Sequence, residues 1–157
     1  MFEIQERDVP EQLVLVEQRS LFVQELPDFI GSALGRLTGV AEGHGGVVGA
    51  PFVVFHGMVD AENDGPVEVC VPIAPAHEGS SGVPMRTEEA HREAYATLRK
   101  EQVAFPEILG AYDAVATWID AQGLAVAAGP REVYFTDFVA AAPGDEVCDV
   151  AFPIQAR

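Results

Sequence analysis

The apolar and polar residues of this chain follow two periodicities, one typical of strands and one of helices. Residues 12–20 begin with an apolar run, QLVLV, that predicts a strand. Pro27 then suits the first turn of a helix, where its missing N–H costs nothing, and Asp28 complements the positive helix end. From Phe29 to Ala41 apolar residues recur every three or four positions, which predicts a helix with one buried stripe, ended by the glycines of residues 43–46.

The same pattern predicts two strands after this helix and then a second round of the same elements. Residues 51–56 and 67–73 are strand-like, and the turn signal NDGP at 63–66 joins them as antiparallel neighbours. The second round consists of a strand, a helix and two further strands, at residues 92–99, 106–122, 131–138 and 147–154. The apolar stripe of the second helix is expected to consist of Ile108, Leu109, Tyr112, Val115, Ala116 and Ile119. Tyr112 is therefore expected to be a core residue.

The chain also repeats its own sequence at a spacing of about 80 residues. Three segments return in the same order: LPDFIG at 26 as FPEILG at 105, PFVVF at 51 as PREVY at 130, and EVCVPI at 68 as DVAFPI at 149. Three ordered matches predict a duplicated unit. The places where the two copies differ are therefore where function is to be sought.

Together these features predict one α+β domain over residues 1–157, built of duplicated β-α-β-β modules related by a pseudo-twofold axis. Antiparallel sheets with two helices on one side are expected, with a ligand groove between the modules. The expected boundaries are about 1–74 for module one, about 75–85 for a linker rich in Pro, Gly and Ser, and about 86–157 for module two.

Composition narrows the classes of function. The formal charge of −16 opposes binding to phosphate backbones and anionic lipids, so direct nucleic-acid and membrane partners are not expected, whereas cationic small molecules are attracted. The N-terminus lacks an export signal, and a cytoplasmic location is expected. Cys70 and Cys148 form no short-spaced pair, and His44, His56, His77 and His91 show no ligand spacing, so neither a metal nor another cofactor is expected.

The most informative difference between the copies is at Glu132. Strand alternation places Glu132 and Tyr134 on one face and Val133 and Phe135 on the other, and the apolar pair is expected to pack on the helix. The positions that match Glu132 and Tyr134 in the first copy are Val53 and Phe55. A carboxylate among aromatic rings suits a cationic, planar ligand, since each cation–π contact contributes about 0.5–2 kcal/mol. The alternative is a Glu132 that is simply solvated on an exposed sheet face.

Other aromatic residues are candidates for the walls of such a site. Phe55 shares the face of Tyr134 through the repeat, and Tyr95 lies in the first strand of the second copy, where a cross-strand structural role is an equal alternative. Trp118 borders the helix stripe, where core packing is the alternative to contact with a ligand. His56 occupies the position of Phe135 and is expected to be a buried, hydrogen-bonded histidine.

At this level the chain resembles the GyrI-like domain, also called the AraC-type effector-binding domain. The residues that carry the resemblance are GAPFVVFHG at 49–57, VEVCVPI at 67–73, GPREVY at 129–134 and FPI at 152–154. The resemblance implies a small-molecule site between two modules, with a glutamate on the penultimate strand among aromatic rings. Glu132 matches that glutamate, and the Asp-Pro that often follows the tyrosine is Asp137-Phe138 here.

The resemblance also implies a choice of functions. Many relatives are sensor halves of transcription activators for lipophilic cations, and this chain, which has no residues left for a DNA reader, resembles a stand-alone member. The leading hypothesis is a multidrug-type protein that sequesters or senses amphipathic, often cationic or planar, compounds. The alternatives are a hydrolase of electrophilic cyclopropane-bearing toxins, with Glu132 as its catalytic residue, and a regulatory module that binds a protein partner through an acidic face.

Overall fold

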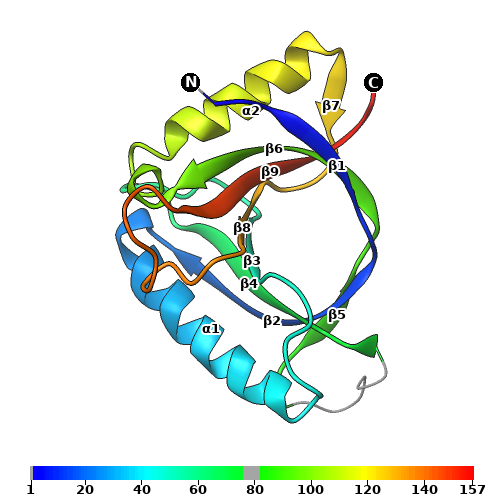
Figure 1. Cartoon of the computed structure of the whole chain (residues 1–157), viewed down its shortest axis with the longest axis vertical. Helices are drawn as coiled ribbons and strands as arrows, with labels where there is room; N and C mark the ends of the chain where they lie inside the picture. Colours follow the sequence, from blue (N-terminus) through cyan, green and yellow to red (C-terminus); the bar gives the residue numbers. More distant parts are fainter. Residues whose placement is uncertain (1, 76–81) are drawn as a thin grey trace. The chain divides into compact units, whose positions relative to one another are not determined.

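The computed structural model of the chain describes residues 2–75 and 82–157, so His77 and much of the expected linker lie outside the described residues. The chain divides into two compact units: unit 1 comprises Met1–Val9 and His91–Arg157, and unit 2 comprises Pro10–Ala90. Each unit is a mixed α+β structure with one long helix and an antiparallel sheet (Figure 1). Neither helix within the described ranges has the length and apolar character needed to cross a membrane.

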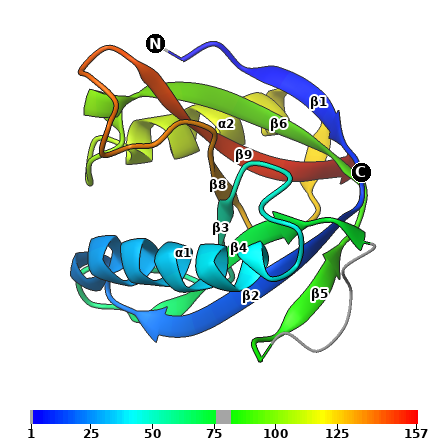
Figure 2. The same cartoon turned by 60° about the horizontal axis from the view of Figure 1, so that its bottom comes forward.

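Unit 2 contains a four-stranded antiparallel sheet in the order β3-β4-β2-β5. Its elements in chain order are β2 (Gln12–Leu21), the short 3-10 helix η1 (Val23–Glu25), α1 (Leu26–Glu42), β3 (Phe52–Phe55), β4 (Gly65–Ile73) and β5 (Met85–Glu88). The strand, helix and hairpin expected from the sequence are confirmed. Helix α1 packs along β2 and β4, as Figure 2 shows from below.

Unit 1 repeats this plan with the strand order β1-β6-β9-β8, and β7 also pairs with β9. Its elements are β1 (Gln5–Val9), β6 (His91–Arg99), the 3-10 helix η3 (Lys100–Gln102), α2 (Leu109–Ala121), β7 (Leu124–Val126), β8 (Arg131–Tyr134) and β9 (Glu146–Ala156). Blue β1 and red β9 therefore flank β6 in one sheet, so both ends of the chain belong to unit 1 (Figure 1).

The boundaries of these units differ from the expected modules because each copy gives its first strand to the other unit. Strand β1 precedes β2 in the chain but pairs with β6, and β5 precedes β6 but pairs with β2. The linking residues 10–11 and 89–90 contain no Asn-Gly or Gly-X pair, the signals that favour a tight hairpin. Each of these strands lies at the end of the other copy's sheet.

The cores form where each helix meets its sheet. In α1 the buried residues Phe29, Ala33, Leu37 and Ala41 follow the predicted stripe. In α2 they are Ala111, Val115 and Ile119, whereas Leu109 and Ala116, predicted for the stripe, are exposed. The buried stripe of α2 is therefore narrower than predicted, and Leu109 and Ala116 lie outside it.

Each unit also holds an arginine from its exchanged strand against a buried acid, on β9 in unit 1 and on β4 in unit 2. Arg7 on β1 donates to Asp149 at 2.7 Å, and Arg86 on β5 donates to Glu68 at 2.7 and 2.9 Å. Both acids are about 5% exposed. A buried carboxylate is tolerated when it is paired and hydrogen-bonded, so these pairs fix the exchanged strands to their sheets.

Candidate functional site around Glu132

Glu132 lies on β8 of unit 1 and is 6% exposed, so it is not solvated on an open sheet face. Both of its carboxylate oxygens accept hydrogen bonds from phenols. The hydroxyl of Tyr112 donates to Oε2 at 2.6 Å, and that of Tyr134 donates to Oε1 at 2.5 Å. A buried carboxylate held by two aromatic alcohols is therefore the centre of this site.

Strand register places the three side chains together. In the β8–β9 pair, Glu132 is opposite Val150 and Tyr134 is opposite Cys148, so the four share one face of the sheet. Tyr112 reaches this face from α2, and its ring meets that of Phe152 edge-on, with centroids 5.9 Å apart. The site thus lies between helix α2 and the sheet of unit 1.

This arrangement corrects the facing expected from the sequence. Val133 and Phe135 were expected to pack on the helix, but the helix-facing residues are Glu132 and Tyr134, and Phe135 is 44% exposed. The apolar character of Val133 and Phe135 did not predict which face packs on the helix. Two phenols donate hydrogen bonds to the Glu132 carboxylate and allow it to be buried on that face.

Burial sets the protonation of the cluster. Burial raises the pKa of Glu132 above its ordinary value, and the two phenol hydrogen bonds only partly oppose this. Burial and the neighbouring Glu132 charge raise the pKa values of Tyr112 and Tyr134 well above 10, so both phenols remain donors. Burial likewise raises the pKa of the Cys148 thiol, which keeps it in its unreactive protonated form.

The other predicted wall residues do not all join Glu132. Tyr95 pairs with Ala151, as does Arg131, so it lies on the opposite face of the sheet, where its hydroxyl donates to Gln5 at 2.7 Å and Arg7 lies over its ring. Trp118 on α2 packs against the apolar core of unit 1. Phe55 lies on β3 of unit 2, at the position that matches Tyr134.

Tyr112 is the residue that sequence reasoning missed, since it was expected to be core. Comparison of the copies could have found it: Tyr112 matches the fully buried Ala33, just as Glu132 matches the fully buried Val53. Phe55 matches Tyr134, which adds a hydroxyl. All three members of the polar cluster are thus gains of hydrogen-bonding groups in one copy at positions that are apolar in the other.

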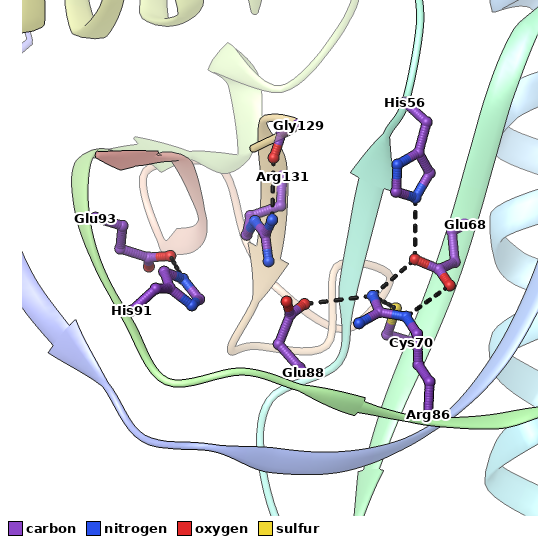
Figure 3. Close-up of polar contacts among 9 residues, drawn as sticks. All are labelled: His56, Glu68, Cys70, Arg86, Glu88, His91, Glu93, Gly129 and Arg131. Carbon is purple, nitrogen blue, oxygen red and sulfur yellow. Dashed lines mark hydrogen bonds and ion pairs between the residues drawn. The ribbon is translucent and has the colours of Figure 1, made fainter. Parts of the chain in front are cut away.

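Figure 3 shows a second polar cluster, which belongs to unit 2. His56 Nε2 lies 3.1 Å from Oε1 of Glu68, and the Arg86 guanidinium donates to the same carboxylate and lies 3.5 Å from the Cys70 sulfur. Burial alone would raise the pKa of Glu68, but the hydrogen bonds from Arg86 and His56 hold it below its ordinary value. The His56 side chain is 40% exposed, so the expectation of a buried histidine is wrong, although its hydrogen bond is present.

In unit 1, His91 Nε2 lies 2.8 Å from Oε1 of Glu93, also drawn in Figure 3, and Arg7 donates to Oε2 of the same acid. These clusters neutralise buried acids and account for the positions of both histidines. Within residues 2–75 and 82–157, no three His, Cys, Asp or Glu side chains are grouped closely enough to hold a metal ion.

Comparison with known proteins identifies the fold. No family model matches the chain, and no curated protein matches it in sequence. Among solved structures, the EcmrR C-terminal domain is 15% identical with a TM-score of 0.80, over 100% of this chain and 99% of that domain. The EcmrR chain in a complex with DNA is also 15% identical, with a TM-score of 0.79, and this chain spans 58% of its length.

Two further structures share the fold. A hydrolase from Listeria innocua is 14% identical, with a TM-score of 0.69, over 98% of this chain and 92% of that one. SAV2435, solved with bound tetraphenylphosphonium, is 14% identical, with a TM-score of 0.62, over 98% and 94%. The fold expected from the sequence is therefore confirmed.

Proposed function

Since this chain has the fold of the GyrI-like effector-binding domains, we propose that it binds amphipathic, cationic or planar small molecules at the Glu132 cluster. The observation that carries the proposal is the buried Glu132 carboxylate held between the phenols of Tyr112 and Tyr134. A cation beside this carboxylate stabilises its ionised form, which burial otherwise makes unfavourable. The rings of the cluster offer faces on which such a cation can lie.

The preferred ligand follows from the same geometry. Burial makes the ionised form of Glu132 unfavourable, so the ligand should not add a large desolvation cost of its own. A cation that is weakly hydrated and has a delocalised charge is therefore favoured. SAV2435, which has the same fold, is solved with such a cation, tetraphenylphosphonium. In this proposal the protein senses or sequesters compounds of that class, and the acidic charge of the chain raises their local concentration.

Fluorescence polarisation with rhodamine-type dyes, and competition by tetraphenylphosphonium, tests the proposal. Glu132→Gln keeps the shape and removes the charge, and it is expected to weaken binding about tenfold or more, which corresponds to about 1.4 kcal/mol. Tyr95→Phe is the matched control, because Tyr95 lies on the other face of the same sheet. If Glu132→Gln binds the dyes as tightly as the parent protein, the electrostatic explanation is wrong.

A hydrolase of electrophilic, cyclopropane-bearing compounds is the second candidate. Two observations favour it: burial raises the pKa of Glu132, as is typical of carboxyl groups that transfer protons in active sites, and a hydrolase from Listeria innocua shares the fold. In this reaction Glu132 would exchange a proton with the opening ring or with the attacking water. Turnover distinguishes the two functions, because a binding protein yields no more than one equivalent of product per chain.

A further inference from the structure

The loop that joins β8 to β9 packs beside Tyr134, one of the two phenols of the Glu132 site. Residues 135–145 follow Tyr134 directly, and their one buried apolar residue, Ala141, packs with Val147 and Cys148 (the orange loop in Figures 1 and 2). Tyr134 packs against this small cluster, and its hydroxyl in turn donates to Glu132. A contiguous set of contacts therefore connects the loop to the carboxylate.

Lys100, the single lysine of the chain, holds this loop in place. Its ammonium donates to the carbonyl oxygen of Ala141 at 2.6 Å and lies 5.2 Å from the centre of the Phe138 ring. Its backbone N–H donates to the carbonyl of Asp145 at 2.9 Å. The neighbouring Glu101 side chain accepts from the N–H of Gly144 at 2.9 Å. Residues of the 3-10 helix η3 thus contact the loop at Phe138, Ala141, Gly144 and Asp145.

The rest of the loop is bonded mainly to itself and projects apolar side chains outward. Asp137 accepts from the N–H groups of Val139 and Ala141, and Asp145 and Ala142 bond each other. Val139 is 87% exposed and Phe138 40% exposed. Internal hydrogen bonds let such a segment move as one piece, and few buried contacts place it at the low-stability end of the structure.

We propose that residues 135–145 form a lid over the Glu132 site and that Lys100 is the positioning residue that keeps it closed. This inference rests on the proposed function. Glu132 is buried in the closed structure, so a ligand can contact it only after the lid opens. Release of the Lys100 ammonium from Ala141 lets the Ala141 methyl group leave its packing with Cys148 and Tyr134. Exchange of ligand then proceeds through this opening.

Cys148 provides a probe of the lid that needs no ligand. Its side chain is fully buried beside Ala141, so a thiol reagent reaches it only when the cover opens. In a Cys70→Ala background, where Cys148 is the remaining thiol, Lys100→Met is expected to accelerate its modification about ten- to a hundredfold, as for loss of one charge-assisted hydrogen bond. Lys100→Arg, which retains a donor, is expected to stay near the parent rate.

Two controls separate lid opening from general unfolding. In a Cys148→Ala background, the rate for Cys70, which lies in unit 2, is expected not to change with Lys100→Met. Arg157→Met removes an exposed pair with Asp120 and is expected to leave the Cys148 rate unchanged. The proposal is overturned if Lys100→Met leaves the Cys148 rate at the parent value, or if both thiols accelerate equally.

The ligand arm of the experiment uses tetraphenylphosphonium. With the lid released, its association and dissociation rates are expected to rise together, about tenfold, with little change in Kd. If Cys148 accelerates and tetraphenylphosphonium binds neither protein, the lid stands and the proposed function fails. If tetraphenylphosphonium binds but its rates are the same in parent and Lys100→Met proteins, the lid does not control access and the inference fails.

Discussion

At the scale of single residues, the function proposed here depends on how a carboxylate is kept in an apolar place. Val53 shows what the fold requires at this position of the strand, because it is fully buried and apolar. Glu132 occupies the matching position only because Tyr112 and Tyr134 each give it a hydrogen bond. A carboxylate whose pKa is shifted by burial is typical of a functional site.

The cost of burying this carboxylate is measurable as a pH-dependent difference in stability. Because burial raises the pKa of Glu132 in the folded protein, the proton binds more tightly to the folded than to the unfolded chain. Stability is therefore lost as pH rises from the unfolded pKa through the folded one. Glu132→Gln removes this loss, so its stability relative to the parent is expected to increase over that window, by about 1.4 kcal/mol for each unit of the shift.

Urea unfolding of both proteins between about pH 4 and about pH 8 measures this difference. A constant offset between the two proteins is compatible with the expectation, because glutamine replaces one phenol hydrogen bond imperfectly. A difference that does not vary with pH would show that Glu132 ionises in the folded protein as it does in the unfolded chain.

At the scale of elements, the exchanged strands are the least expected feature. Strand β1 is held to β6 by backbone pairing and by Arg7, whose guanidinium bonds both Glu93 and Asp149. Burial alone would raise the pKa of Glu93, but His91 and Arg7 hold it below its ordinary value. Glu93 thus contributes stability that is present above its unfolded pKa and is lost as the pH falls through its folded pKa.

Removal of the Arg7 guanidinium is expected to be severe and pH-dependent. Arg7→Met leaves two buried carboxylates with one cation fewer, which costs about 3–5 kcal/mol at neutral pH. The deficit is expected to shrink as the pH falls through the folded pKa of Glu93 and acid protonates this carboxylate. Arg92→Met, on the partner strand β6, is the matched control, and it is expected to cost less than about 1 kcal/mol, because Arg92 pairs with the exposed Glu6 and Asp8. Equal losses in the two variants at neutral pH would contradict this assignment.

The elements also show what the sequence could and could not predict. The long strands and both helices follow from periodicity, since β2, β4, β6 and β9 are apolar enough to show it. Strand β1, with the sequence QERDV, has no apolar alternation because it lies at a sheet edge and is held by charges. Its pairing with β6, 86 residues away, is set by partners that no local pattern reveals.

The site was predictable to the extent that it appears in the repeat. Glu132 and Tyr134 stand out because their matching residues, Val53 and Phe55, are apolar. Tyr112 was hidden by its place in a helical stripe, where an aromatic ring is ordinary core. Its hydroxyl became informative only when register put β8 against the same face as α2.

At the scale of the whole molecule, the two units share one plan, but the polar cluster is present in one of them. The positions in unit 2 that match Tyr112, Glu132 and Tyr134 are Ala33, Val53 and Phe55. These offer a cation neither a charge nor a hydroxyl, so one bound cation per chain is expected. Equilibrium dialysis with tetraphenylphosphonium measures this ratio, and two equivalent sites per chain would contradict it.

The acidic charge of the molecule and the buried carboxylate are expected to act over different distances. The formal charge of −16 attracts any cation from solution, and salt screens this attraction. The Glu132 carboxylate acts at contact and from within the protein, where salt has little access. A change in the ionisation of the Glu132 carboxylate therefore distinguishes specific binding from general attraction to the acidic surface.

The most direct test is an NMR titration of the Glu132 side-chain carboxyl carbon, with and without tetraphenylphosphonium. In the free protein the Glu132 pKa is expected to lie above its ordinary value, because burial disfavours the charge. Bound tetraphenylphosphonium is predicted to lower that pKa, because the cation stabilises the ionised carboxylate. A Glu132 pKa that is unchanged when tetraphenylphosphonium is bound would show that the cation does not bind beside this carboxylate.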